Sequence, residues 1–258
     1  MKIGFIGTGN MGSALLTAMA GSGYSICASN RGREKLEAVC AAAGAEAMAD
    51  NSAVTEAADV LFLAVKPVFM EGILQEIAPF VHTGQLIVTM AAGLDIAFYE
   101  SILGTEQKII RIMPNTPAQV GAGVTAYCGN AQVTAEDRAL LVQLLETAGS
   151  TMEMPERLMG AVTALTGSSP AYVYMFIEAM SDGAVMAGIP RQQATQLAAQ
   201  AVLGAAKMVL ETGKHPGELK DAVCSPGGTT IQAVAELEKR GMRASVIEAM
   251  RVCTAAGK

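Results

Sequence analysis

The chain opens with Lys2-Ile3-Gly4-Phe5-Ile6-Gly7-Thr8-Gly9-Asn10-Met11-Gly12, and this stretch decides its fold. The apolar residues up to Ile6 predict a buried parallel strand, and residues 13–20 predict a helix. Between the two, the glycines at positions 7, 9 and 12 fit the pattern G-x-G-x-x-G. Between a strand and a helix, that pattern is typical of a loop that binds a dinucleotide.

Each of the three glycines has a different expected role in such a loop. Gly7 allows the tight turn, Gly9 lets the backbone approach a pyrophosphate, and Gly12 lets the helix pack closely on the strand. The free N–H groups at the start of the helix then face the phosphates. The alternative is a strand–loop–helix unit that uses its glycines only for turning.

The composition excludes several classes of protein. The chain has 258 residues, 51% hydrophobic and 16% charged, and its net charge of −6 argues against a nucleic-acid surface. So few charges among so many apolar residues indicate surface that another subunit covers. The glycine motif begins at once, without a basic start and an apolar run, so we expect no signal peptide. The longest apolar run, residues 60–65, is too short to span a membrane, and we expect a cytoplasmic protein.

The cysteines and histidines do not suggest chemistry of their own. The five cysteines are scattered without C-x-x-C spacing and predict reduced, small apolar side chains. They are Cys27, Cys40, Cys128, Cys224 and Cys253. His82 and His215 lie next to turn residues, where capping or surface roles are expected rather than catalysis. No cluster has metal-ligand spacing, and no metal is predicted.

Strand and helix patterns alternate through the first part of the chain. Strands are expected at residues 3–6, 24–28, 45–47, 60–65, 86–90 and 108–113, with helices between them. Such alternation predicts an α/β fold with a doubly wound parallel sheet. Two further strands are expected at residues 124–128 and 151–153, the last at the edge of the sheet.

The pattern changes near Pro155, so we predict a nucleotide-binding domain at residues 1–155 and a helical domain at residues 156–258. Ser168-Ser169-Pro170 predicts a helix cap and a first-turn proline, and hence the start of a helix that runs to about Ala187. Further helices are expected at residues 190–212, 216–223, 229–239 and 242–256.

The end of the second strand bears on the choice of cofactor. A site that prefers NAD normally carries Asp or Glu there to bind the ribose 2′-OH, but this chain has Ala28-Ser29-Asn30-Arg31. Asn30 and Arg31 can instead hold the 2′-phosphate of NADP, because an arginine is always charged. We therefore predict NADP as cofactor, with NADPH preferred and NADH left open. The alternative is a solvated helix start with a surface arginine.

Three more loops follow strands of the predicted sheet, at the edge where such sheets bind ligands. They are Ala64-Val65-Lys66-Pro67, Met90-Ala91-Ala92-Gly93 and Met113-Pro114-Asn115-Thr116-Pro117. Lys66 can hydrogen-bond a ribose or the substrate, and Asn115 can pair with an amide or ring nitrogen. Each loop can equally be an ordinary turn. The full predicted cofactor site is Ile6, Gly7, Thr8, Gly9, Asn10, Met11, Gly12, Asn30, Arg31, Asn51, Ala64, Val65, Lys66, Pro67, Met90, Ala91, Ala92 and Asn115.

A second anion site is predicted in the helical part. Ser225-Pro226-Gly227-Gly228-Thr229-Thr230 opens a helix that continues from Ile231. Its glycines expose backbone N–H groups, the helix start adds partial positive charge, and two hydroxyls flank it. That combination suits a carboxylate. The alternative is a capped helix after a glycine turn.

Together these residues resemble the pyrroline-5-carboxylate reductase family, which catalyses the last step of proline biosynthesis. The resemblance covers nearly the whole chain and rests on residues 4–11, 61–67, 111–117, 167–172 and 221–231. The first stretch is shared with many reductases, whereas the last is highly specific. One departure is Ser169, where the family usually has glycine.

The resemblance implies an N-terminal Rossmann domain and an all-α C-terminal domain that forms a homodimer, with assembly into a higher oligomer left open. It implies NAD(P)H-dependent reduction of 1-pyrroline-5-carboxylate to L-proline by hydride transfer to C5 of the cyclic imine. Backbone N–H groups of Gly228, Thr229 and Thr230 would hold the substrate carboxylate near the dimer interface. The Thr230 hydroxyl would lie near the ring nitrogen, which makes Thr230 the catalytic candidate. The implied substrate site is Ser225, Gly227, Gly228, Thr229 and Thr230.

Two other functions are compatible with parts of the sequence. A β-hydroxyacid dehydrogenase also opens with this glycine pattern, but it needs a lysine in the interdomain helix. The helix after Pro170 has no Lys or Arg before Arg191, which argues against that reading. The second alternative is an NADP-binding sensor whose helical part is only a dimer module.

Overall fold

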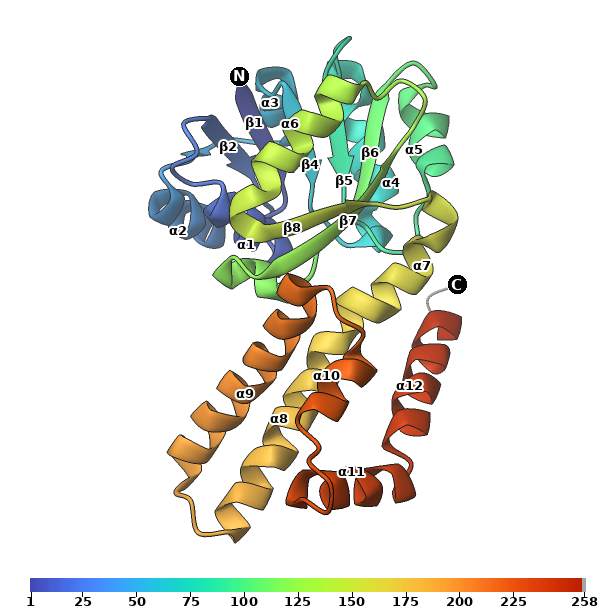
Figure 1. Ribbon diagram of the computed structural model, residues 1–258. Helices are drawn as coiled ribbons and strands as arrows, with labels where there is room; N and C mark the ends of the chain where they lie inside the picture. The colour runs from blue at the N-terminus through green and yellow to red at the C-terminus, as the bar shows by residue number, and fades with distance from the viewer. Residues whose placement is uncertain (257–258) are drawn as a thin grey trace. The chain divides into compact units, whose positions relative to one another are not determined.

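The computed structural model describes residues 1–256 of the chain (Figure 1). The chain divides into two compact units, Met1–Gly167 and Ser168–Ala255. The first unit contains a sheet with helices on both faces, and the second contains helices alone. Met159 and Val162 lie beyond the predicted boundary near Pro155, yet both are buried in the core of the first unit. The predicted boundary between functional domains stays a prediction.

The first unit is built on one sheet of eight strands in the order β3-β2-β1-β4-β5-β6-β7-β8. The strands are β1 (Lys2–Ile6), β2 (Ser25–Ser29), β3 (Glu46–Ala47), β4 (Val60–Leu63), β5 (Leu86–Thr89), β6 (Lys108–Met113), β7 (Gly123–Gly129) and β8 (Gly149–Glu153). Every neighbouring pair is parallel except β6 and β7, so the predicted doubly wound sheet is confirmed. β7 is antiparallel because only a 3₁₀ turn, η2 (Thr116–Val120), precedes it, and a parallel return needs a longer crossover.

Helices cover both faces of the sheet, and alternation along the strands divides the core in two. One face carries α1 (Asn10–Ala18), α2 (Arg33–Ala43) and α6 (Ala135–Leu145). The other carries α3 (Asn51–Ala57), α4 (Pro67–Ile77), α5 (Ile96–Leu103) and α7 (Met159–Val162). Phe5 and Phe62, on neighbouring strands, point to the first face and stack with ring centroids 4.7 Å apart. Ile6 and Leu63 point to the second face. Short 3₁₀ turns complete the unit, namely η1 (Ala78–Phe80), η3 (Glu146–Ala148) and η4 (Glu156–Leu158).

The predicted helix after Ser168-Ser169-Pro170 is confirmed as α8 (Ser169–Met186), with Pro170 in its first turn, but the predicted cap is wrong. The chain is already helical from Met159, passes through a π-helix at Thr163–Ser168 (η5), and continues as α8 (Ser169–Met186). Ser168 has helical backbone angles, φ −96° and ψ −31°, and its side chain caps no N–H group. A serine before a proline therefore marks the change from a π-helix to the α-helix α8 here, and it caps neither of them.

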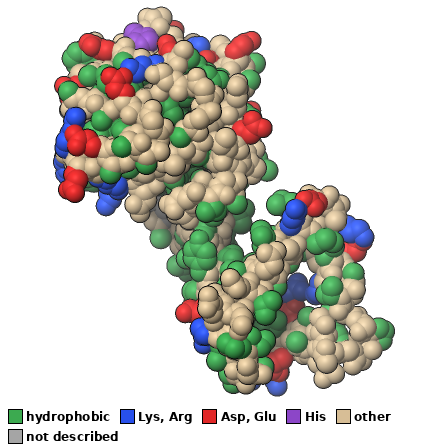
Figure 2. All heavy atoms as spheres, turned by 90° about the vertical axis from the view of Figure 1, so that its left-hand side faces the viewer, with side chains coloured by type: hydrophobic (Ala, Val, Ile, Leu, Met, Phe, Trp, Pro, Cys, Tyr) green, Lys and Arg blue, Asp and Glu red, His purple; other side chains and the backbone are tan. Residues whose placement is uncertain are grey.

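The second unit consists of the long helices that the sequence predicts. They are α8, α9 (Arg191–Thr212), α10 (Pro216–Ala222), α11 (Thr229–Lys239) and α12 (Met242–Ala256). Many large apolar side chains of this unit are exposed, and Figure 2 shows hydrophobic groups across its surface. They include Tyr174, Met175, Met186, Leu197, Leu203, Leu210, Ile247 and Val252. Within residues 1–256, every helix is too short or too polar to cross a bilayer.

Candidate active site

Most of the predicted cofactor residues lie at one edge of the sheet. Strands β1, β2, β4, β5 and β6 are parallel, so the loops that follow them lie at the same carboxyl edge. The strand order reverses between β1 and β4, which have β2 and β5 as their outer neighbours. A doubly wound sheet binds ligands at such a reversal. The glycine loop follows β1, directly at this point.

The three glycines of that loop differ in what the protein itself requires. Gly7 has φ +98°, and a Cβ there would lie 2.6 Å from the carbonyl oxygen of Ala64. A Cβ on Gly12 would lie 2.3 Å from the carbonyl oxygen of Gly7. Gly9 has an ordinary φ of −66°, and a Cβ there would meet no atom within 4 Å. Packing therefore explains two of the glycines, and the third leaves open a space that a side chain would fill.

That open space lies at the start of α1. Gly9 is the N-cap residue of this helix, and no side chain caps it. The N–H groups of the first turn have no partner within a helix, and they carry its partial positive charge. A pyrophosphate would accept hydrogen bonds from these N–H groups and balance the partial positive charge, and no Cβ at Gly9 would block its approach. The residues present thus fit a dinucleotide.

Asn30 braces the glycine loop. Its Oδ1 accepts a hydrogen bond from the N–H of Thr8 at 3.2 Å, and its Nδ2 donates to the carbonyl of Gly32 at 3.1 Å. Beside it, the N–H of Gly7 donates to the carbonyl of Ser29 at 2.9 Å. Both amide atoms of Asn30 are thus engaged, which leaves Arg31 as the freer of the two residues predicted to meet a 2′-phosphate.

Arg31 contacts a residue that sequence reasoning missed. Its guanidinium carbon lies 5.4 Å from the ring centroid of Phe69, in the first turn of α4. This cation–π contact joins the loop after β2 to the start of α4, and the glycine loop lies between them. Phe69 is 47% exposed, although it is an aromatic residue in a chain with few of them. In the sequence, the position of Phe69 two residues after the predicted site residue Pro67 was the only indication that it lies near the cofactor site.

Asn51 links the end of β2 to α4. Its Oδ1 accepts from the Ser29 hydroxyl at 2.7 Å, and its Nδ2 donates to Glu76 at 3.0 Å. Lys66 is the N-cap residue of α4 and is exposed, and it takes part in none of the ion pairs formed by residues 1–256. Lys66 is therefore available to a ligand, whereas the Asn51 amide already holds protein partners.

The predicted residues after β5 and β6 also lie at this edge. Met90 is partly buried, Ala91 is buried and Ala92 is exposed. Asn115 is only 8% exposed, and the oxygen and the nitrogen of its side-chain amide each form a hydrogen bond with a backbone group of the protein. Direct contact between Asn115 and a cofactor stays a prediction.

The predicted substrate loop, residues 225–230, lies in the second unit and opens α11. Gly227 has φ +68°, and the N–H of Gly228 donates to the carbonyl of Ser225 at 3.0 Å, which closes a tight turn. Gly228 is the N-cap residue, and no side chain caps the helix. Thr229 and Thr230 are exposed in its first turn, with their N–H groups free of intrahelical bonds. The loop can accept a carboxylate on these groups.

Two buried thiols of the first unit are not activated for catalysis. Burial raises the pKa of the Cys27 and Cys128 thiols to about 11, which keeps both protonated and unreactive. All five cysteines are free. His215 caps α10 by accepting from the N–H of Gly217 at 3.1 Å, in agreement with the capping role expected for it. Among residues 1–256, no three His, Cys, Asp or Glu side chains gather as metal ligands would.

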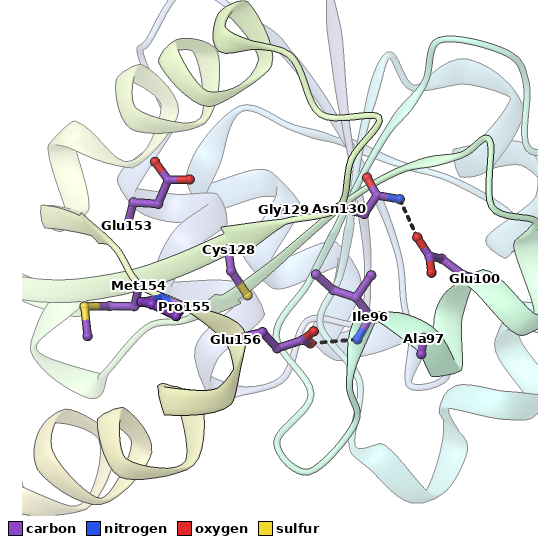
Figure 3. Close-up of a pocket in the computed structure, with 10 residues that line it drawn as sticks. All are labelled: Ile96, Ala97, Glu100, Cys128, Gly129, Asn130, Glu153, Met154, Pro155 and Glu156. Carbon is purple, nitrogen blue, oxygen red and sulfur yellow. Dashed lines mark hydrogen bonds between the residues drawn. The ribbon is translucent and has the colours of Figure 1, made fainter.

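A surface cavity of about 550 Å³ in the first unit contains none of the predicted residues (Figure 3). Three carboxylates line it, those of Glu100, Glu153 and Glu156. All three are already engaged. Glu156 accepts from the N–H of Ile96 at 2.7 Å, Glu100 accepts from the Asn130 amide at 2.9 Å, and Glu153 accepts from the Nε of Arg138 at 3.0 Å. The cavity is therefore distinct from the nucleotide loops, and its carboxylates brace neighbouring elements.

The doubly wound sheet, the glycine loop at its point of reversal and the uncapped start of α1 define a dinucleotide-binding protein of the Rossmann class. Residues 2–93 match the family model described as NADP oxidoreductase, coenzyme F420-dependent. Residues 156–258 match the one described as pyrroline-5-carboxylate reductase dimerisation.

The chain belongs to the pyrroline-5-carboxylate reductase family. It is 49% identical to the pyrroline-5-carboxylate reductase of Escherichia coli (strain K12), over 98% of this chain and 95% of that protein. The solved pyrroline-5-carboxylate reductase structure from Coxiella burnetii is similar with a TM-score of 0.91 and 34% identity, covering 99% of this chain and 96% of that one. The Plasmodium falciparum structure, with NADP bound, gives a TM-score of 0.90 and 31% identity, covering 100% of this chain and 97% of that one. The family resemblance inferred from the sequence is confirmed.

Proposed function

We propose that this protein reduces 1-pyrroline-5-carboxylate to L-proline with NADPH, as the final step of proline biosynthesis. The observation that carries the proposal is the open 225–230 loop, an uncapped helix start suited to a carboxylate. It occurs in a chain whose relatives are named for this reaction. When bound, NADPH supplies the hydride that C5 of the cyclic imine accepts.

The cofactor is held by the loops at the carboxyl edge of the sheet. The N–H groups at the start of α1 bind the pyrophosphate over Gly9, where no side chain intervenes. Arg31, held against Phe69, meets the 2′-phosphate, and Lys66 is free to bond a ribose hydroxyl. No carboxylate follows β2, which supports NADPH over NADH.

The substrate is held by the other open helix start. Backbone N–H groups of Gly228, Thr229 and Thr230 bind its carboxylate, and the Thr230 hydroxyl orients the ring nitrogen. A protonated imine is already a good electrophile, so the protein need only align it and fix its carboxylate. A threonine hydroxyl is a poor acid near neutral pH, and Thr230 therefore orients the nitrogen rather than protonating it.

The helical part serves as the dimer module. The exposed apolar side chains of α8, α9 and α12 require cover, and residues 156–258 match a dimerisation family. We propose that two copies of the chain form a homodimer. Each copy has a nucleotide-binding domain at residues 1–155 and a helical domain at residues 156–258. The dimer works in the cytoplasm, and assembly into a higher oligomer is left open.

A comparison of substrates tests the proposal against the rival dehydrogenase. NADPH absorbance should fall when 1-pyrroline-5-carboxylate is added and stay constant with a β-keto acid. The helix α8 contains no lysine or arginine for acid–base chemistry on a hydroxy acid. Oxidation of NADPH by the keto acid alone would overturn the proposal, and binding of NADPH without turnover of either compound would favour a sensor.

A further inference from the structure

Asn115 makes two hydrogen bonds that join three segments of the first unit. Its Oδ1 accepts from the N–H of Val124 at 2.9 Å, at the start of β7. Its Nδ2 donates to the carbonyl of Thr166 at 3.1 Å. The side chain itself belongs to the loop after β6, and it is 8% exposed. Its amide is thus buried and committed to the protein at both ends.

One of these partners lies in the π-helix Thr163–Ser168. The hydroxyls of Thr163 and Thr166 donate to the carbonyls of Met159 and Val162, four residues earlier. A π-helical turn is rare and costs regular hydrogen bonding, and such turns occur frequently at functional sites. Asn115 therefore fixes an irregular turn that the helix alone would not hold in one position.

The turn is held at a defined place on the sheet. The loop after β2 receives the ribose with the 2′-phosphate, and a dinucleotide extends across the reversal from there. Its other nucleotide then lies over β4, β5 and β6. Asn115 follows β6, so the π-turn that it bonds is held at the nicotinamide end of the site.

We infer that Asn115 is a positioning residue, which anchors the π-turn Thr163–Ser168 beside the loop after β6, at the nicotinamide end of the proposed cofactor site. This inference rests on the proposed function. Through the π-turn, Asn115 acts on the alignment for hydride transfer and not on the affinity for NADPH. Its role then differs from the direct cofactor contact that the sequence predicts for it.

The test uses Asn115→Ala in the full-length protein, with three measurements. The dissociation constant of NADPH, from a fluorescence titration, should change less than about twofold. The kcat with 1-pyrroline-5-carboxylate should fall at least about tenfold, because small misplacements of reacting groups are costly. The deuterium isotope effect on kcat, with NADPH labelled at the transferred position, should rise as hydride transfer becomes limiting. If this variant does not fold, Asn115→Asp carries the test, since it keeps the acceptor for Val124 and loses the donor to Thr166.

Asn130→Ala is the matched control. Asn130 is 9% exposed, its Oδ1 accepts from the N–H of Ile109 and its Nδ2 donates to the carbonyl of Gln107. It makes the same kind of bonds at the opposite end of β6, so its variant should lose stability and keep kcat within about twofold.

Three results would overturn the inference. One is an unchanged kcat in Asn115→Ala. Another is a raised NADPH dissociation constant with an unchanged isotope effect, which would make Asn115 a direct ligand. A third is an equal loss of kcat in Asn130→Ala, which would reduce the effect to stability. Failure of the unchanged protein to oxidise NADPH with the imine would instead refute the proposed function, and the inference with it.

Discussion

At the scale of single residues, the two threonines that open α11 make the proposed substrate site testable. Both are exposed in the first turn, but their proposed contributions differ. Thr230→Ala removes one neutral hydrogen bond to the ring nitrogen, worth about 0.5–1.5 kcal/mol, and should lower kcat a few-fold to about tenfold. NADPH binding should not change. Thr229→Ala should do less, because the backbone N–H of Thr229 survives the substitution. Steady-state kinetics that show Thr229→Ala crippled and Thr230→Ala unaffected would mean that the two roles are reversed.

Arg31 should decide between the two cofactors. Arg31→Ala should raise the KM for NADPH about tenfold and leave the KM for NADH nearly unchanged, because only NADPH has a 2′-phosphate. Phe69→Leu should give a smaller effect of the same kind, since an exposed cation–π contact is worth about 0.5–1 kcal/mol. Arg33→Ala is the control, because Arg33 pairs with Glu37. Equal effects of Arg31→Ala on both cofactors would separate Arg31 from the 2′-phosphate.

The positions of the loop glycines were easier to predict from the sequence than the contacts of the polar side chains around them. Gly7 and Gly12 could be anticipated because strand, turn and helix demand them locally. Asn30 and Asn51 were predicted as cofactor residues, but their amides turn out to brace the glycine loop and α4. An asparagine that follows a strand or opens a helix looks the same in a sequence whether it faces a ligand or another group of the protein. Only tertiary structure distinguishes the two.

At the scale of elements, the start of α6 gives a pH-dependent contribution to stability. Thr134 and Asp137 form a capping box, and Asp137 also pairs with Lys108 at 2.9 Å. Burial by itself would raise the pKa of Asp137, but hydrogen bonds from Lys108 and Thr134 outweigh it, and the pKa is lowered. A lowered folded-state pKa means stabilisation that is present above the unfolded-state value of about 4 and lost as the pH falls through the folded-state value.

Asp137→Asn should therefore lower the free energy of unfolding by about 1 kcal/mol at neutral pH. The difference from the unchanged protein should shrink below about pH 4, where Asp137 of the unfolded chain becomes protonated, and disappear once the pH falls through the lowered folded-state pKa. Urea unfolding at several pH values measures it. The exposed Glu106 makes no ion pair within residues 1–256, and Glu106→Gln should change nothing. If Asp137→Asn lowered the free energy of unfolding by the same amount at every pH, the ionised carboxylate of Asp137 would not be the source of the stabilisation.

Most elements were predictable because their signals are local. Strand β6 matches its predicted bounds because it has a clear apolar pattern and a proline directly after it. The π-helix was missed because Ser168-Ser169-Pro170 has the composition of a helix start. The π-helix follows directly on α7, and the hydroxyls of Thr163 and Thr166 donate hydrogen bonds to backbone carbonyls four residues earlier. No local pattern announces that arrangement.

At the scale of the whole molecule, the second unit should mediate association. Its helices leave Met186 and Leu210 90% and 84% exposed, together with other large apolar side chains. A fragment of residues 160–258 should sediment as a dimer or larger species at micromolar concentration. The nucleotide-binding part alone, residues 1–155, should bind NADPH weakly and show no turnover, since the substrate loop is absent. A well-folded monomer of the helical fragment at high concentration would contradict the proposed dimer module.

The central claim is that this protein transfers a hydride from NADPH to C5 of 1-pyrroline-5-carboxylate. The most direct test uses NADPH that carries deuterium at the transferred position and analyses the product by mass spectrometry. The account predicts L-proline that is one mass unit heavier, with the label at C5, formed in step with NADPH loss. NADPH loss without proline, or proline without the label, would contradict it.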